Sequence, residues 1–215
     1  MKPHIDMPKC RSLITGVIIT LLLAGCSLPK IIILHDPLST DEHVQLGMSY
    51  ESQGKWDLAA AQYREAVAMD KRNARAWNLL GDLSYQQKNY DAAESAYRKV
   101  LDLQPGNGDT RNNLAWIFIQ RGTDLSQANE LVAEAIRLLP DHKPYYLDTR
   151  GMILLREGNL QAAIAVLKEA VETIPREQKA LLAEAYGHLA EALKAAGEEQ
   201  NAADMLRKQH DLTAP

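Results

Sequence analysis

Residues 76–105 read AWNLLGDLSYQQKNYDAAESAYRKVLDLQP and carry the fullest copy of a pattern that returns along most of the sequence. One marked alanine recurs at intervals of 34 or 35 residues, as Ala59, Ala93, Ala128 and Ala163. Two further series stay in phase with it: a small residue, at Leu46-Gly47, Leu80-Gly81, Leu114-Ala115 and Gly151, and a closing proline, at Pro105, Pro140 and Pro175. The chain is therefore an array of repeated units.

Each unit reads as two antiparallel helices joined by a turn. The small residue of the first helix and the alanine of the second fall where the helices cross, so their backbones can approach closely. Large neighbours such as Trp77, Leu80 and Tyr97 fill the flanking space on one apolar face. A proline such as Pro105 lacks a backbone donor and ends the second helix.

This pattern resembles the tetratricopeptide repeat family. The resemblance implies an all-α fold, a right-handed superhelical solenoid of helix-turn-helix repeats, over residues 40–212. The predicted units are 40–73, 74–107, 108–143, 144–177 and a degenerate capping repeat at 183–212. The third unit carries one extra residue near Thr123, and the fifth is preceded by about five extra residues.

The N-terminus has the organisation of a secretory signal. Basic residues, the last of them Arg11, precede an apolar run over residues 13–23 that is too short to span a membrane. The run ends in Leu23-Ala24-Gly25-Cys26, which resembles the lipobox of bacterial lipoproteins. The resemblance implies that residues 1–25 are removed as a lipoprotein signal peptide and that Cys26 is acylated, for example with palmitate. Several acyl chains would hold the protein on a membrane durably.

Two other interpretations of this segment remain open. One is an ordinary secretory signal followed by a structural cysteine, and the other is a buried apolar helix. For a Gram-negative host, Ser27 after the cysteine favours the outer membrane, with the protein facing the periplasm. Residues 26–39 then form a lipidated tether. Its apolar part, residues 31–34, either packs on the first helix or lipid, or occupies the protein's own groove.

In the tetratricopeptide repeat family the first helices of successive units line a concave surface, where partners bind. The register predicts a protein-binding groove lined by Val44, Met48, Asn78, Asp82, Tyr85, Asn112, Trp116, Ile119, Asp148, Met152 and Leu155. Four of these, Trp116, Ile119, Met152 and Leu155, would form a hydrophobic strip for an amphipathic helix or an extended peptide. The alternative is that they only pack between neighbouring first helices.

Some members of this family grip a partner's terminal carboxylate with basic and amide side chains. Here Asn113 matches one such position, but Val44, Met48, Tyr145 and Thr149 occupy the others. A carboxylate clamp is therefore not expected.

Composition argues against other classes of function. The net charge is −4, and residues 1–25 carry three basic side chains and one acidic side chain, so the remainder has a net charge of −6. Such a body lacks the basic surface that nucleic acid requires. The six histidines, His4, His35, His43, His142, His188 and His210, show no metal-ligand spacing, and most are expected in turns or at helix ends. No phosphate loop or nucleophile elbow is present, so neither a cofactor nor a small-molecule substrate is expected.

The sequence thus predicts a non-enzymatic, membrane-anchored lipoprotein with tetratricopeptide repeats, a scaffold that binds a protein or peptide partner during assembly of an envelope complex. The alternative is a pilotin-like factor, similar to the repeat lipoproteins that escort secretin subunits during type IV pilus assembly. Those pilotins usually carry about six well-formed repeats, whereas this chain has four and a degenerate fifth.

Overall fold

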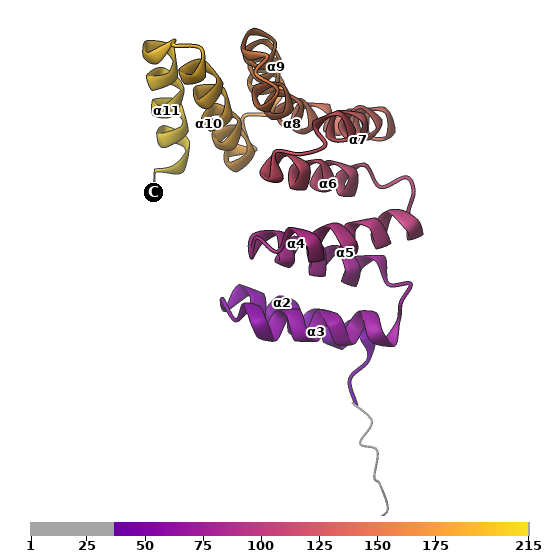
Figure 1. Ribbon diagram of the computed structural model, residues 1–215. Coiled ribbons are helices and arrows are strands. Elements are labelled where there is room, and N and C mark those ends of the chain that lie inside the picture. The colour runs from indigo at the N-terminus through magenta and orange to yellow at the C-terminus, as the bar shows by residue number, and fades with distance from the viewer. Residues whose placement is uncertain (1–36, 215) are drawn as a thin grey trace, which may run out of the picture. The chain divides into compact units, whose positions relative to one another are not determined.

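The structure is a computed structural model that describes residues 37–214. Within these residues all regular secondary structure is helical (Figure 1). The elements are α2 (Thr40–Ser52), α3 (Trp56–Met69), α4 (Ala74–Gln86), α5 (Tyr90–Leu103), α6 (Gly108–Arg121), α7 (Leu125–Leu138), the 3₁₀ turn η1 (Pro140–His142), α8 (Lys143–Arg156), α9 (Leu160–Thr173), α10 (Lys179–Ala195) and α11 (Glu199–Thr213). The predicted all-α solenoid of helix pairs is confirmed.

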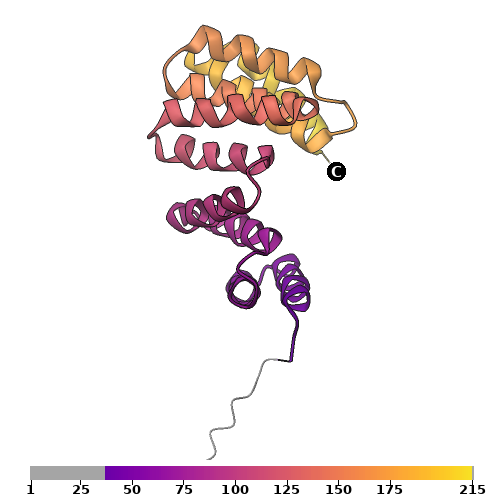
Figure 2. The same ribbon diagram turned by 90° about the vertical axis from the view of Figure 1, so that its right-hand side faces the viewer.

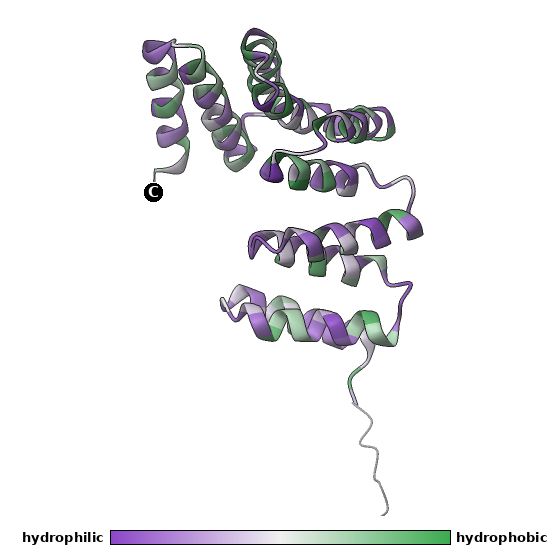
Figure 3. Cartoon of the chain, in the orientation of Figure 1, coloured by the Kyte–Doolittle hydropathy of each residue, from purple (hydrophilic) through white to green (hydrophobic). Residues whose placement is uncertain are grey.

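Consecutive helices pack as five pairs: α2 with α3, α4 with α5, α6 with α7, α8 with α9 and α10 with α11. The second helix of each pair also packs on the first helix of the next, and the two views together show the pairs stacked one after another (Figure 2). Figure 3 shows hydrophobic and hydrophilic residues mixed on the same helices, as expected for helices that each bury one stripe.

The helices cross where the small residues stand. A Cβ atom added at Gly81 would lie 2.6 Å from Cε1 of Tyr97, and one added at Gly151 would lie 2.4 Å from Cγ of Leu167. Tyr97 and Leu167 themselves are buried. Glycine is therefore required here for the close approach of two helices rather than for an unusual backbone angle.

Local signals set the ends of the helices. Ser39 caps α2 through a capping box with Glu42, whose backbone N–H donates to the serine hydroxyl at 3.3 Å and whose carboxylate accepts from the Ser39 N–H at 2.7 Å. Pro105, Pro140 and Pro175 each stand two residues beyond the end of a second helix, as predicted from the sequence.

Burial is unequal along the stack. One large cluster of buried residues extends from Ala93 to Ala202, whereas the first pair is held to α4 by two small clusters centred on Val44 and Tyr63. In the later units the first helices also pack directly on each other, α6 on α8 and α8 on α10. The later units therefore share a continuous core, which the first unit does not join.

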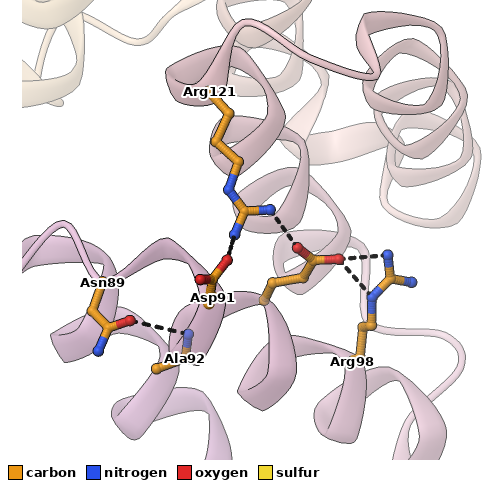
Figure 4. A network of polar contacts seen from close by, with 6 residues as sticks. Asn89, Asp91, Ala92, Arg98 and Arg121 are labelled. Atoms are coloured by element: carbon orange, nitrogen blue, oxygen red, sulfur yellow. Dashed lines mark hydrogen bonds and ion pairs between the residues drawn. The ribbon is translucent and has the colours of Figure 1, made fainter.

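An ion-pair network joins the second and third units. Arg121 at the end of α6 donates to Glu94 at 2.6 Å and to Asp91 at 2.5 Å, both on α5. Glu94 also accepts from Arg98 one turn further along α5 (Figure 4). The side chains of Arg121 and Glu94 are both about three-quarters buried, so their ion pair is less exposed to solvent than an ordinary surface pair, whereas Asp91 is exposed.

Several predicted segments lie outside the described residues. They are the signal peptide at 1–25, Cys26, and the apolar residues 31–34 of the tether. In the fifth unit, α10 begins at Lys179 rather than near 183 and has 17 residues, so the degenerate repeat starts earlier than its predicted boundary. Among the described helices, none has both the length and the apolar character needed to cross a membrane.

Candidate functional site: a groove along the first helices

A groove of about 600 Å³ runs across the first helices of four successive units. We call it the first-helix groove. Its lining residues are Asp82, Tyr85 and Gln86 of α4, Tyr97 of α5, Asn113, Trp116 and Gln120 of α6, Tyr145 and Asp148 of α8, and Glu184 and His188 of α10. Only Tyr97 comes from a second helix, so the groove lies on the face that the sequence analysis predicts for partner binding.

Four of the eleven predicted groove residues line it: Asp82, Tyr85, Trp116 and Asp148. The predicted hydrophobic strip is wrong as an exposed surface, because Ile119, Met152 and Leu155 are only 2%, 2% and 8% exposed. These three side chains belong to the large core. The structure thus supports the alternative reading, in which they fill the contacts of α6 with α8 and of α8 with α10.

The other predicted residues also lie outside the groove. Val44 and Asn112 are buried, and Met48, which is 41% exposed, accepts a contact from Arg75 at 3.4 Å. Asn78 lies beneath the groove, where its amide donates to Asp82 at 2.8 Å and its carbonyl accepts from Thr110 at 3.1 Å.

The groove crosses the first helices diagonally. Its lining residues therefore do not stand at the same position in every repeat, as the prediction from the sequence had assumed. The groove uses the C-terminal end of α4, the middle and C-terminal half of α6, and the N-terminal part of α8, where Tyr145 lies. Each unit is rotated relative to the one before it, so the exposed point shifts along successive first helices. The lining residues that were not predicted from the sequence are Gln86, Tyr97, Asn113, Gln120, Tyr145, Glu184 and His188.

The sequence did contain a signal for one of the lining residues that were not predicted, His188. It lies within α10 and not at a helix end, and it follows Glu184 by one helical turn, so both side chains share a face. His43 lies in the first turn of α2 and is buried. Of the four histidines that the structure describes, His188 is therefore the exception to the expectation of turns and helix ends, since His142 lies in η1 and His210 in the last turn of α11.

Three units meet at His188. Its ring packs against Trp116 of α6 in a tilted arrangement, with 5.4 Å between ring centroids, and its Nδ1 lies 2.8 Å from Oδ2 of Asp148 on α8. Burial opposes protonation of His188, but the hydrogen bond and charge of Asp148 outweigh it and raise the pKa of the imidazole. The imidazole of His188 therefore joins α10 to α6 and α8 at the wall of the groove, through its contact with Trp116 and its hydrogen bond with Asp148.

Asp82 lies at the other end of the groove and has only neutral partners. One carboxylate oxygen accepts from the Tyr97 hydroxyl at 2.7 Å and from the Asn113 amide at 3.3 Å, and the other accepts from Asn78 at 2.8 Å. Burial raises the pKa of Asp82, although the bonds from Tyr97 and Asn113 act in the opposite direction.

The lining as a whole is aromatic and acidic. Among the described residues it includes three carboxylates, those of Asp82, Asp148 and Glu184, and neither lysine nor arginine. Burial raises the pKa of Tyr145 to about 12 and raises that of Tyr85, so both phenols stay neutral and can donate hydrogen bonds. This lining can bind a polypeptide through its aromatic rings and hydrogen-bonding groups, whereas its carboxylates would repel an anion.

A second hollow, of about 870 Å³, lies among α9, α10 and α11. It uses Leu182, Tyr186, Leu189 and Leu193, a face of α10 different from that of Glu184 and His188. Within the part of the chain that the structure describes, no group of three or more histidine, cysteine or acidic side chains is arranged to hold a metal ion.

Comparisons with known proteins agree with this architecture. Three family models described as "Tetratricopeptide repeat" match residues 44–108, 84–153 and 145–177. The type IV pilus assembly protein PilF of Pseudomonas aeruginosa is 34% identical over 108 residues, which are 48% of this chain and 41% of that protein. This chain therefore matches less than half the length of that relative.

Two solved structures share the fold. PilW, titled a widely conserved type IV pilus biogenesis factor, has a TM-score of 0.70 at 21% identity and is matched over 82% of this chain and 78% of its own. YrrB, titled a TPR protein with an unusual peptide-binding site, has a TM-score of 0.56 at 20% identity, over 81% of this chain and 87% of its own. From its repeats, its stacked helix pairs and these matches, the chain is a tetratricopeptide repeat protein.

Proposed function

We propose that this protein is a non-enzymatic adaptor that holds a polypeptide partner in the first-helix groove during assembly of a cell-envelope complex. The observation that carries the proposal is the groove itself, which is accessible, aromatic and rich in hydrogen-bonding groups over four units. A tetratricopeptide repeat fold is an interaction scaffold, and a structural neighbour is titled for its peptide-binding site.

We further propose that the protein acts in type IV pilus assembly. The 34% identity to PilF and the structural likeness to PilW favour this candidate over an unspecified envelope assembly. In this role the protein would act like a pilotin and escort secretin subunits to the outer membrane. A lipid anchor would support that role.

The lipid anchor at Cys26 is also a proposal, supported by the Leu23-Ala24-Gly25-Cys26 motif after an apolar run. It would place the protein on the outer membrane, facing the periplasm of a Gram-negative host. Cys26→Ser is expected to abolish labelling by a clickable palmitate analogue and to leave unprocessed precursor. Continued labelling of that variant would refute the anchor.

Crosslinking in the native host tests the groove. A photoreactive p-benzoylphenylalanine placed at Gln120, an exposed groove residue, is expected to form one discrete adduct with a polypeptide. The same amino acid at Arg98, exposed on α5 outside the groove lining, serves as the matched control. Equal adducts from both positions, or none from Gln120, would reject the groove as the binding surface.

Deletion of the protein tests the assignment to pilus assembly. In that strain we expect loss of secretin multimers from the outer membrane and loss of pili, restored by the wild-type chain. Normal multimers and normal piliation would eliminate the pilus role and leave only the broader adaptor function.

A further inference from the structure

We infer that the partner presents a basic side chain, of which arginine fits best, to Asp82 in the first-helix groove. This inference rests on the proposed function and adds the chemistry of the partner. It is carried by three observations: the carboxylate of Asp82, whose hydrogen-bond partners are all neutral, the aromatic side chains that line the same groove, and the absence of lysine and arginine from the described lining.

The carboxylate of Asp82 has room for one more donor. An ionised carboxylate offers about four acceptor sites. Tyr97, Asn113 and Asn78 occupy three of them, and all three donors are neutral. No lysine or arginine of the described chain pairs with this carboxylate, so its negative charge is partly buried and is offset only by hydrogen bonds from neutral groups, which costs free energy. A cation brought by a partner would remove that cost.

The walls of the groove favour a planar cation. Tyr85, Trp116 and Tyr145 line the same groove as Asp82. A guanidinium group stacks on aromatic faces and donates charge-assisted hydrogen bonds, whereas an ammonium group is more strongly hydrated and does not stack. Arginine therefore matches both the carboxylate and the rings.

The remaining charges of the groove point to the same sign of partner. Glu184 is exposed and makes no ion pair with a lysine or arginine within residues 37–214. Asp148 is already engaged by His188, so it contributes less to an incoming cation. Because the groove has a net negative charge, a basic segment is attracted and an acidic segment is repelled.

The test uses the full chain purified in mild detergent and three fluorescent peptide pools. The pools share randomised flanking positions without lysine or arginine and differ only in a central arginine, citrulline or glutamate. By fluorescence anisotropy, the arginine pool is expected to bind about tenfold more tightly than the citrulline pool, which has the same shape without the charge.

Variants of the protein locate the effect. Asp82→Asn keeps one acceptor oxygen for Tyr97 and Asn113 but removes the charge and the acceptor of the Asn78 amide. It is expected to reduce affinity for the arginine pool about tenfold and to change the thermal midpoint only slightly. Asp102→Asn removes the same charge from α5 outside the groove and should leave the affinity unchanged. Glu184→Gln is expected to weaken binding less, because that carboxylate is exposed.

The outcomes separate the two proposals. If the citrulline or glutamate pool binds as tightly as the arginine pool, and Trp116→Ala abolishes that binding, the groove binds peptides but the inference about charge is wrong. Equal loss from Asp82→Asn and Asp102→Asn would reduce the effect to bulk charge and also overturn the inference. If no pool binds in a manner that depends on Trp116, the proposed function fails together with it.

Discussion

The first unit and the later units of this stack are built from the same pattern but are stabilised differently. In the first unit, two small clusters around Val44 and Tyr63 join α2 and α3 to α4. From α5 onward a continuous core forms, because α6, α8 and α10 also pack on one another. The repeat motif therefore fixes each helix pair, while the residues between first helices determine how strongly neighbouring pairs stabilise each other.

The largest expected effect separates the two regions directly. Ile153 is fully buried in the continuous core, so Ile153→Ala is expected to lower the free energy of unfolding by about 2–5 kcal/mol. Val67→Ala in the first unit removes fewer buried atoms, and we expect it to cost about 1–2 kcal/mol. Urea unfolding followed by circular dichroism measures both.

Amide hydrogen exchange can test whether the first unit opens independently of the later units. Val67→Ala is expected to increase amide exchange mainly in α2 and α3, whereas Ile153→Ala should increase it from α6 to α10. Uniform acceleration throughout the chain by either variant would show that the stack unfolds as one unit and would remove the distinction.

The next effect concerns the helix crossing. Gly81→Leu places side-chain atoms where the ring of Tyr97 lies, and we expect it to cost about 1–3 kcal/mol through overpacking. Gly106→Ala is the matched control, since a Cβ atom there would meet nothing within 4 Å. An unaltered melting curve for Gly81→Leu would contradict the crossing geometry.

A smaller effect is expected at the junction between the second and third units. Arg121→Met removes the contacts with Asp91 and Glu94 but keeps an unbranched apolar side chain, so the expected cost is about 1 kcal/mol. The loss should shrink in high salt, as befits an ion pair. Arg98→Met, which removes only a contact within α5, should cost less. The prediction is refuted if the two variants melt alike.

The smallest expected effect depends on pH. Because the pKa of His188 is higher in the folded chain than its ordinary value, its contribution to stability is present at pH below that ordinary value and is lost as the pH rises through the raised pKa. Asp148→Asn removes the main partner of the imidazole and is expected to flatten this part of the profile of thermal midpoint against pH. Glu184 and Glu191 also favour the charged imidazole, so a small dependence should remain.

The sequence predicts the fold well because its markers act locally. Gly81, Ala93 and Pro105 each control a crossing or a helix end within one unit, and the structure places helices accordingly. The site is predicted only in part, because it depends on the rotation between units. Trp116 could be identified from its unit alone, but burial of Met152 follows from the packing of α8 on its neighbours, and the role of His188 follows from its reach to α6 and α8.

One feature of the second unit restricts how its specificity can change. The Tyr97 ring fills the space left by Gly81, and its hydroxyl donates to Asp82, so a single side chain serves both the helix crossing and the groove. Replacing Asp82 by an aliphatic residue would leave that hydroxyl without this acceptor. Among the described residues, no buried side chain depends on Glu184 in the same way. Divergence toward new partners, in nature or in directed evolution, should therefore accumulate more readily on α10 than at Asp82.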